Sequence, residues 1–345
     1  MNIQEFLLRN IKIATRAFSS VGAFVALVLL IVGVTIAQPH FLVYGNIMNI
    51  LSQWAPVGVM GIGMTFVVII GGFDLSVGSI YALCAVTSAA IGQSQSPVIA
   101  YVVAIAVGFV AGTLNGLIVT WLRVNPFIAT LGSSLAISGV TLILTGNAAI
   151  VVNNPSFGIL GANRLGGFPY SGMLMIALFV ILGLILAFTP YGQSIYAVGG
   201  NADASRLAGI RTFFVTGSSY AISGLCAGIA GCVTASQLSS AQATIDPNLV
   251  FNVLTVVVLG GTVLGGGRGA VWRTAIGVGI LATLHNGFNL LNINAYYQNI
   301  IQGFVIVAAS ASVDWSRFLI VRSANPLNVP GPEDQLFGNQ DNKGE

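Results

Sequence analysis

The chain has 345 residues, of which 55% are hydrophobic and only 6% are charged, and its mean hydropathy is +0.90. A soluble domain carries roughly 25% charged residues, so this sequence lacks the polar side chains that a water-facing surface needs. Disordered, fibrous and disulfide-stapled chains are also excluded, because the apolar content is high and there are only three cysteines. The composition predicts an all-α polytopic membrane protein, in which the 43 glycines let helices pack closely or break.

The gaps between charged residues indicate how many helices cross the membrane. A helix needs about 20 residues to cross the ~30 Å bilayer core. Three charge-free stretches, 17–73, 75–122 and 274–313, each have room for two spans, and four shorter stretches have room for one each. We therefore expect about ten transmembrane helices, at 19–37, 48–70, 76–92, 97–121, 126–145, 171–189, 213–237, 247–264, 274–292 and 296–312.

The Lys and Arg residues indicate the orientation in the membrane. With the N-terminus in the cytoplasm, eleven of the twelve fall on the cytoplasmic side, and only Arg164 falls outside. We expect both termini in the cytoplasm, with a cytoplasmic segment at 1–18, the membrane domain at 19–315 and a disordered tail at 316–345. A cleaved secretory signal is the alternative reading of the N-terminus, but the apolar run is long for one. The net charge of +3 then reflects topology and not nucleic-acid binding.

Glycines recur at helical spacing within two of the predicted spans. Gly108, Gly112 and Gly116 share one face of the span at 97–121, and Gly224 and Gly228 share one face of the span at 213–237. Small residues at this spacing let two membrane helices approach closely. We expect these faces to pack against neighbouring helices; direct contact with a transported substrate is the alternative.

Other glycines mark places where the helices break. The segment 71–74 separates the second span from the third, and 260–267 interrupts the chain near Arg268. Non-helical backbone at membrane depth is tolerated only where it is buried in protein or faces a water-filled cavity. The breaks therefore favour a transporter or channel, although Asp74 also suits a simple helix cap. The order of the spans allows an inverted repeat of spans two to five and seven to ten, a common arrangement in transporters.

Several kinds of site are missing from the sequence. Lys12 and Lys343 are the only lysines, so a G-x4-G-K-[ST] phosphate-binding loop is absent and ATP-driven work would need another subunit. Scarce charge within the spans counts against ion coupling. His40 and His285 have no partners at metal-ligand spacing. We expect no catalytic residue, no metal site and no bound cofactor, and we interpret His285 as a packing or pore-lining group rather than a base.

The longest internal loop, 190–211, has the pattern of a docking element. A short helix is expected over 201–209, with Asn201 as its N-cap and Gly209 at its end. This helix would expose Leu207 beside Arg206, a pattern that suits binding of a partner subunit. A solvated turn between two spans is the alternative reading.

Four sequence blocks resemble those of ribose-type sugar ABC importer permeases, in the branched binding-protein-dependent permease family. The block 197–210 is similar to the family's coupling loop, and 71–79, 125–132 and 259–272 are similar to three further blocks in the same order and at family spacing. The resemblance covers about 40–315. Phe73 departs from the pattern, because the family often has Ile at this position.

The resemblance implies partners that the composition does not reveal. Two permease chains, as a homodimer in the bacterial inner membrane, would form one pathway, and each would dock an ATP-binding cassette subunit that holds ATP and Mg. An external sugar-binding protein would deliver the monosaccharide. The competing hypotheses are an ion-coupled secondary transporter of a small polar solute and a membrane-embedded enzyme or receptor.

The resemblance also implies roles for nine residues. The residues expected at the ATPase contact are Gly199, Asn201, Arg206, Leu207 and Gly209. The residues expected along the translocation pathway are Phe73, Asn115, Phe127 and Asn286. The alternatives are that the first group only shapes the loop and that the asparagines make hydrogen bonds between helices.

Overall fold

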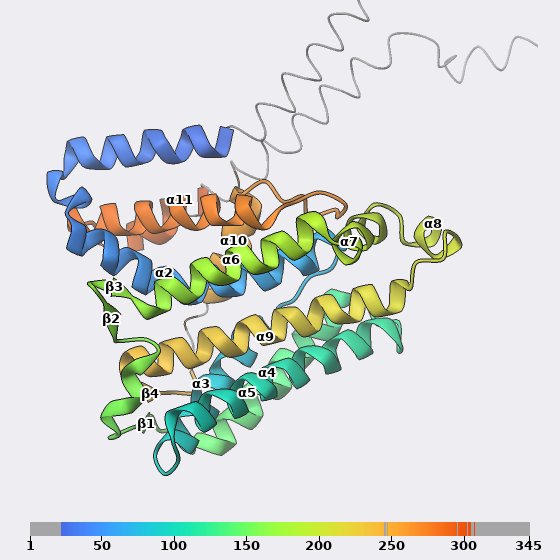
Figure 1. The fold of residues 1–345 in the computed structure, drawn as a ribbon, viewed down its shortest axis with the longest axis horizontal. Helices are drawn as coiled ribbons and strands as arrows, with labels where there is room; N and C mark the ends of the chain where they lie inside the picture. The colour runs from blue at the N-terminus through green and yellow to red at the C-terminus, as the bar shows by residue number, and fades with distance from the viewer. Residues whose placement is uncertain are drawn as a thin grey trace, which may run out of the picture.

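The computed structural model describes residues 22–307 except 245, 247, 295, 302, 305 and 306. These residues form a bundle of helices that run roughly parallel to one long axis of the molecule (Figure 1). The expectations for the segment 1–18 and the tail 316–345 lie outside the described residues, and so do both termini. Part of the predicted span at 296–312 lies outside them as well.

Helices lie close to each of the first nine predicted spans. They are Gly22–Ala37, α2 (Tyr44–Ile69), α3 (Val77–Gly92), α4 (Pro97–Thr120), α5 (Pro126–Thr145), α6 (Tyr170–Phe188), α9 (Thr212–Leu238), α10 (Asn248–Leu259) and α11 (Val271–Leu290). In the described part, α2, α4, α5, α6 and α9 are each long and apolar enough to cross a membrane. The all-α polytopic class is confirmed; the number of spans and the orientation of the termini remain predictions.

Short elements join the helices at the two ends of the bundle. At one end lie η1 (Pro39–Leu42), η2 (Pro155–Ile159) and four strands: β1 (Ile150–Val151), β2 (Arg164–Leu165), β3 (Phe168–Pro169) and β4 (Ser240–Ala241). β1 pairs antiparallel with β4, with Ile150 opposite Ala241, and β2 pairs antiparallel with β3. The opposite end carries α7 (Pro190–Gly200) and α8 (Ala202–Leu207) (Figure 1).

α10 is shorter than the span expected at 247–264. It ends at Leu259, because Gly261 takes a φ of +84° that helical residues do not adopt. The backbone at Gly260 also lies so close to Arg273 that a Cβ would be 2.4 Å from the Arg273 carbonyl oxygen. The break predicted at 260–267 is therefore confirmed, and the predicted helix bound beyond it was wrong.

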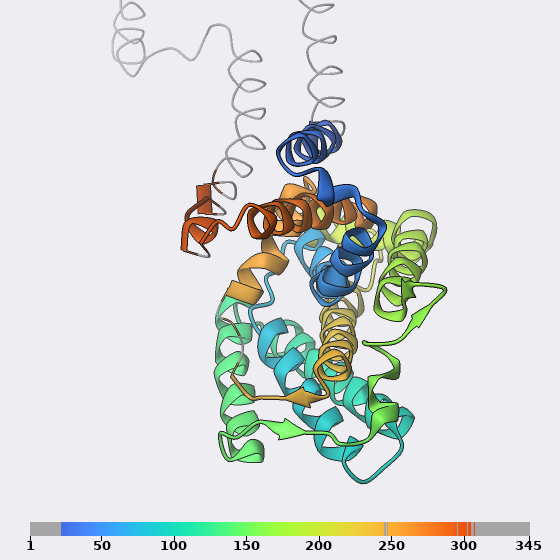
Figure 2. The ribbon, with the colours of Figure 1, turned by 90° about the vertical axis from the view of Figure 1, so that its left-hand side faces the viewer.

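The helices α2 and α9 occupy the centre of the bundle (Figure 2). α9 packs on α2, α3 and α4, while α2 packs on α6, α10 and α11 as well. Each central helix starts a series of long, short and long helices: 26, 16 and 24 residues in α2–α4, and 27, 12 and 20 residues in α9–α11. This order is what the expected inverted repeat requires, and the repeat itself remains a hypothesis.

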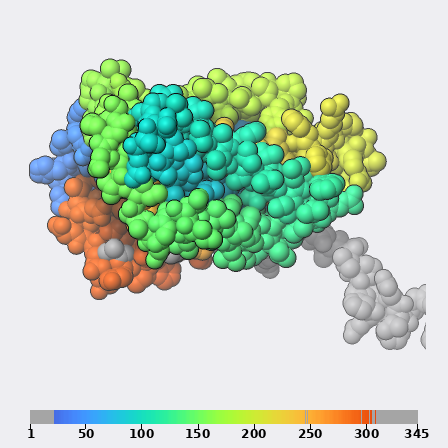
Figure 3. Space-filling view, turned by 90° about the horizontal axis from the view of Figure 1, so that it is seen from below, coloured from blue at the N-terminus to red at the C-terminus, as the bar shows by residue number. Residues whose placement is uncertain are grey.

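The outer helices present apolar side chains to their surroundings. α4 and α5 cover the central part of the face of the molecule that Figure 3 shows. In α5 only Ala129, Thr130 and Thr141 are buried. An apolar helix with so little buried surface suits lipid or a second protein chain and not water.

Candidate functional site

The segment after α6 folds into two helices, where one was expected. α7 begins after Thr189, whose hydroxyl accepts a hydrogen bond from the Gly192 N–H at 3.2 Å. α8 begins after Asn201, whose side-chain oxygen accepts from the Ala204 N–H at 2.9 Å. Gly209 follows α8 with a φ of +85°, a conformation that favours glycine. The helix predicted over 201–209 and its cap are confirmed, and α7 was missed.

α8 projects from one end of the molecule (Figures 1 and 3). Its Leu207 side chain is 86% exposed. The neighbouring Arg206 guanidinium lies 3.3 Å from the Asp203 carboxylate, and both side chains are largely in solvent, so their ion pair adds little to stability. An exposed leucine beside two charges is a surface that a partner protein can cover.

Gly199 differs from the other residues expected at the ATPase contact, because it faces the rest of the chain. A Cβ on Gly199 would be 1.8 Å from the carbonyl oxygen of Ile69, the last residue of α2. The Tyr196 hydroxyl, in the same helix, donates to the Gly269 carbonyl at 2.8 Å. Burial raises the pKa of Tyr196 further above neutral pH, where a tyrosine hydroxyl is already protonated. α7 therefore connects α8 to the bundle.

The break between α2 and α3 holds a buried carboxylate. Asp74 is 1% exposed. Its carboxylate accepts hydrogen bonds from the Ser76 N–H at 3.0 Å and from the Ser76 hydroxyl, as well as from the Ser223 hydroxyl of α9 at 2.6 Å. The expected cap is thus part of a larger network, because Asn115 of α4 donates to the Ser76 hydroxyl at 2.7 Å. Asp74 therefore joins the break to the start of α3 and to α9, and Ser76 extends the network to α4.

The first turn of α5 also contacts this break. The Thr130 hydroxyl donates to the Pro126 carbonyl oxygen of its own helix at 2.8 Å and accepts from the Leu75 N–H of the break at 3.2 Å. Phe127 lies in the same turn and is 50% exposed. The structure therefore brings Phe73, Asn115 and Phe127, three of the four expected pathway residues, around one break.

Asn286 lies apart from the other three. Its side chain exchanges two hydrogen bonds with Asn46 in the first turn of α2, at 2.9 and 3.0 Å. This pair joins α11 to α2 at the opposite end of α2 from the break. Asn286 therefore makes a hydrogen bond between helices, which was the alternative to a pathway role.

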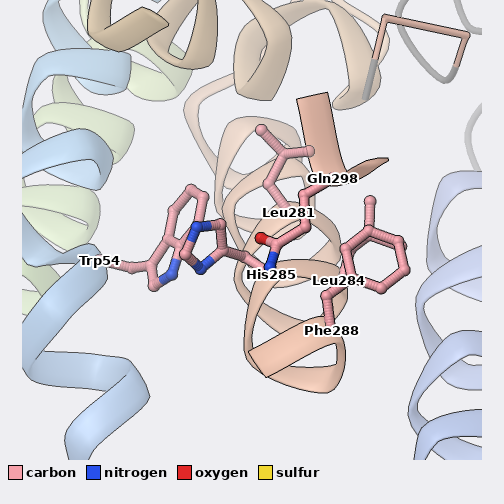
Figure 4. A pocket seen from close by; sticks show the side chains of 6 residues that line it. All are labelled: Trp54, Leu281, Leu284, His285, Phe288 and Gln298. Carbon is pink, nitrogen blue, oxygen red and sulfur yellow. The ribbon is translucent and has the colours of Figure 1, made fainter. Parts of the chain in front are cut away.

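His285, the histidine singled out in the sequence, packs beside an aromatic ring. Its ring centroid lies 5.8 Å from that of Trp54 in an edge-on arrangement (Figure 4). Leu281 and Phe288 line the same small hollow, and Nδ1 of His285 lies 3.3 Å from the Asn289 amide nitrogen. These contacts support a packing role.

The hydrogen-bond partners of the break were not predicted from the sequence. Ser223, Thr130 and Tyr220 all bond to it, the last through a hydroxyl that donates to the Phe73 carbonyl at 3.3 Å. A Ser or Thr within an apolar helix is a weak signal of a contact between helices, because its hydroxyl often bonds to a carbonyl of its own helix. Among the described residues, no three His, Cys, Asp or Glu side chains come together as a metal site requires. Cys84, Cys226 and Cys232 are buried and free.

Comparison with known proteins identifies the family. A family model described as the permease component of branched-chain amino acid transport systems matches residues 46–310. The ribose import permease protein RbsC of Bacillus subtilis strain 168 is 40% identical over 291 residues, which cover 84% of this chain and 90% of that protein. Its counterpart in Escherichia coli K12 is 39% identical over 290 residues, covering 83% and 90%.

A third relative carries a different sugar in its name. The D-allose transport system permease protein AlsC of Escherichia coli K12 is 31% identical over 279 residues, which cover 80% of this chain and 86% of that protein. No solved structure matches the chain. The family model matches residues 46–310, a range that includes the α2–α3 break, α7 and α8. This chain therefore belongs to the family of transport-system permease components.

Proposed function

We propose that this chain is the membrane-spanning permease subunit of an ATP-driven ABC importer for a monosaccharide such as ribose. The observation that carries the proposal is its similarity, over at least 80% of the chain, to two ribose import permeases and an allose permease. The exposed α8 supports it, because a subunit without its own phosphate-binding loop needs a surface that receives the ATP-binding partner.

The proposed importer consists of several chains with different roles. ATP and Mg bind to the partner subunit, and this chain supplies the pathway without a cofactor or a catalytic step of its own. Two copies form one pathway in the bacterial inner membrane, with about ten spans each over 19–315 and both termini in the cytoplasm. A sugar-binding protein delivers the substrate at the strand-bearing end, opposite α8. Phe73, Asn115 and Phe127 near the break are proposed pathway residues, and so is Asn286, whose side chain bonds to Asn46 at the other end of α2.

The test is a pulldown of the tagged full-length chain from its own cells in mild detergent, followed by mass spectrometry. We expect a stoichiometric ATP-binding subunit. A chain that purifies alone and transports in ATP-free vesicles under an ion gradient would contradict the proposal and establish the secondary transporter instead.

A pair of matched variants tests the docking surface. Leu207→Asp places a charge on the exposed apolar side chain of α8, so we expect loss of most of the ATP-binding subunit from the pulldown. Leu165→Asp is the control, since Leu165 is also an exposed leucine, at 61%, but lies in β2 at the other end of the bundle. Equal recovery of the partner with both variants would show that α8 is not the docking site.

A further inference from the structure

The end of α7 lies directly against the end of α2, backbone to backbone. A Cβ on Gly199 would be 1.8 Å from the Ile69 carbonyl oxygen and 2.7 Å from the Gly267 nitrogen. Both distances are far shorter than contacts that a real Cβ makes, and the atoms concerned belong to backbones that cannot rotate away. Only glycine allows this approach.

Two further segments meet at the same point. The Gly267 N–H donates to the same Ile69 carbonyl oxygen at 2.7 Å. A Cβ on Gly266 would be 2.8 Å from the Gly199 carbonyl oxygen and 2.9 Å from the Gly71 nitrogen. We call Gly71, Gly199, Gly266 and Gly267 the glycine junction. It brings together α7, the end of α2 and the loop between α10 and α11.

The glycine junction adjoins the break that gathers the expected pathway residues. Two residues beyond Gly71, the Phe73 carbonyl oxygen accepts a hydrogen bond from Tyr220 of α9, and the nearby Leu75 N–H donates to Thr130 of α5. The next residue, Asp74, bonds to Ser76 and Ser223. A displacement of α7 at Gly199 therefore pushes on a backbone segment that is bonded to three other helices.

We propose that the glycine junction is the positioning element through which the docking helix α8 moves the α2–α3 break. The inference rests on the proposed function, because it requires a partner that binds α8. Close-packed interiors transmit strain. Where two backbones touch, no side chain can rotate to absorb a displacement, so the displacement passes from one backbone to the other. Small shifts at one site become discrete rearrangements elsewhere when a packed element has two arrangements. Nucleotide binding on the partner would thus reach Phe73 and Asp74 through Gly199.

The chain offers a matched pair of variants for the test. Gly199 and Gly200 are adjacent in the last turn of α7, but a Cβ on Gly200 meets nothing within 4 Å. Gly199→Ala and Gly200→Ala therefore make the same change to helix propensity, and only the first disturbs the junction. The experiment uses the full chain with the ATP-binding subunit that copurifies with it. It measures deuterium uptake of peptides covering 65–77 with and without ATP trapped by vanadate.

We expect the wild-type chain and Gly200→Ala to change deuterium uptake at 65–77 when nucleotide is trapped. Gly199→Ala should retain the ATP-binding subunit at wild-type stoichiometry. Its change in deuterium uptake should be smaller than that of the wild type by about fivefold or more, which is the lower end of typical coupling between sites. An unaltered response in Gly199→Ala would overturn the proposal. Loss of the bound subunit from a Gly199→Ala chain that keeps the wild-type melting temperature would overturn it too, because Gly199 would then act in docking.

A measurement on the wild type keeps the proposal testable if Gly199→Ala does not fold. If trapped nucleotide leaves deuterium uptake at 65–77 unchanged in the wild-type complex, the glycine junction does not transmit a movement of α8 to the break. If no ATP-binding subunit copurifies with the wild-type chain, the proposed function itself has failed, and this result is distinct from a bound subunit without a response.

Discussion

Among the described residues, Asp74 is the only Asp, Glu, Lys or Arg that is buried. Inside a membrane protein, a carboxyl group has no water to replace its hydrogen-bond partners. Here two hydroxyls and one backbone N–H point at it, from the break itself and from α9. Asp74 thus stabilises a non-helical segment and joins it to a central helix.

Removal of this carboxylate should destabilise the chain. Asp74→Ala leaves the buried Ser223 hydroxyl without its acceptor and deletes two bonds to Ser76, so we expect a loss of about 2–4 kcal/mol in the free energy of unfolding. Thermal unfolding in detergent, followed by circular dichroism, measures the change. Asp203→Ala is the control, because Asp203 lies in α8 and its side chain is 88% exposed. Similar melting temperatures for the two variants would show that the network carries no stability.

The sequence predicts only part of this network. A lone Asp after two glycines, at the end of an apolar span, marks the break and its cap to Ser76. The bond from Ser223 joins residues 149 positions apart, and the bond from Asn115 to Ser76 spans 39. Such partners depend on which helices become neighbours, and that follows from tertiary packing and not from any local pattern. Asn286 and Asn46, 240 positions apart, illustrate the same limit.

Among the described helices, α4 and α9 share the most extensive contact. The glycines expected to pack do so: a Cβ on Gly112 would be 2.4 Å from the Tyr220 carbonyl oxygen and 2.9 Å from the Gly224 Cα. Gly108 and Gly116 meet α9 in the same way, at Gly224 and Gly217. The absence of side chains lets the two backbones touch, which is how small residues stabilise membrane helix pairs.

Gly112→Ala should force these helices apart. We expect a loss of about 1–3 kcal/mol in the free energy of unfolding, because the added methyl overpacks a backbone contact. Gly132→Ala in α5 is the control: its Cβ meets nothing within 4 Å, so the same change should leave stability equal or slightly higher. Melting temperatures in detergent provide the comparison, and a Gly112→Ala variant as stable as Gly132→Ala would mean that the pair can separate at no cost.

Most helix bounds follow from the sequence, for a physical reason. Capping residues, prolines at the first helical turn and glycine pairs act locally, and Asn125 before Pro126 fixes the start of α5 as expected. α7 and the end of α10 were not predicted. α7 begins with a proline and contains three glycines, a composition typical of a loop, and tertiary contacts such as Tyr196 to Gly269 keep it helical. The strand pair β1–β4 joins segments about 90 residues apart and has no local signal.

The whole molecule has two different ends. One end carries α7 and α8 with Arg206, and Arg211 follows at the start of α9. The other end carries the four short strands, with Arg164 in β2. This separation agrees with the orientation that the Lys and Arg distribution predicts, in which α8 faces the cytoplasm and β2 faces outward. The docking proposal requires this orientation, because ATP is available only on the cytoplasmic side.

Cysteine labelling tests the orientation directly. Leu207→Cys and Leu165→Cys place thiols at exposed positions on opposite ends, while the native Cys84, Cys226 and Cys232 are fully buried and should react little. In a chain expressed without partner subunits, a membrane-impermeant maleimide should label Leu165→Cys in spheroplasts and Leu207→Cys only in inverted vesicles. The reverse pattern would place α8 outside the cell, where no ATP-binding subunit reaches it. Labelling of both from one side would mean that an even number of spans separates residues 165 and 207, and the α6 span between β2 and α7 would have to be reassigned.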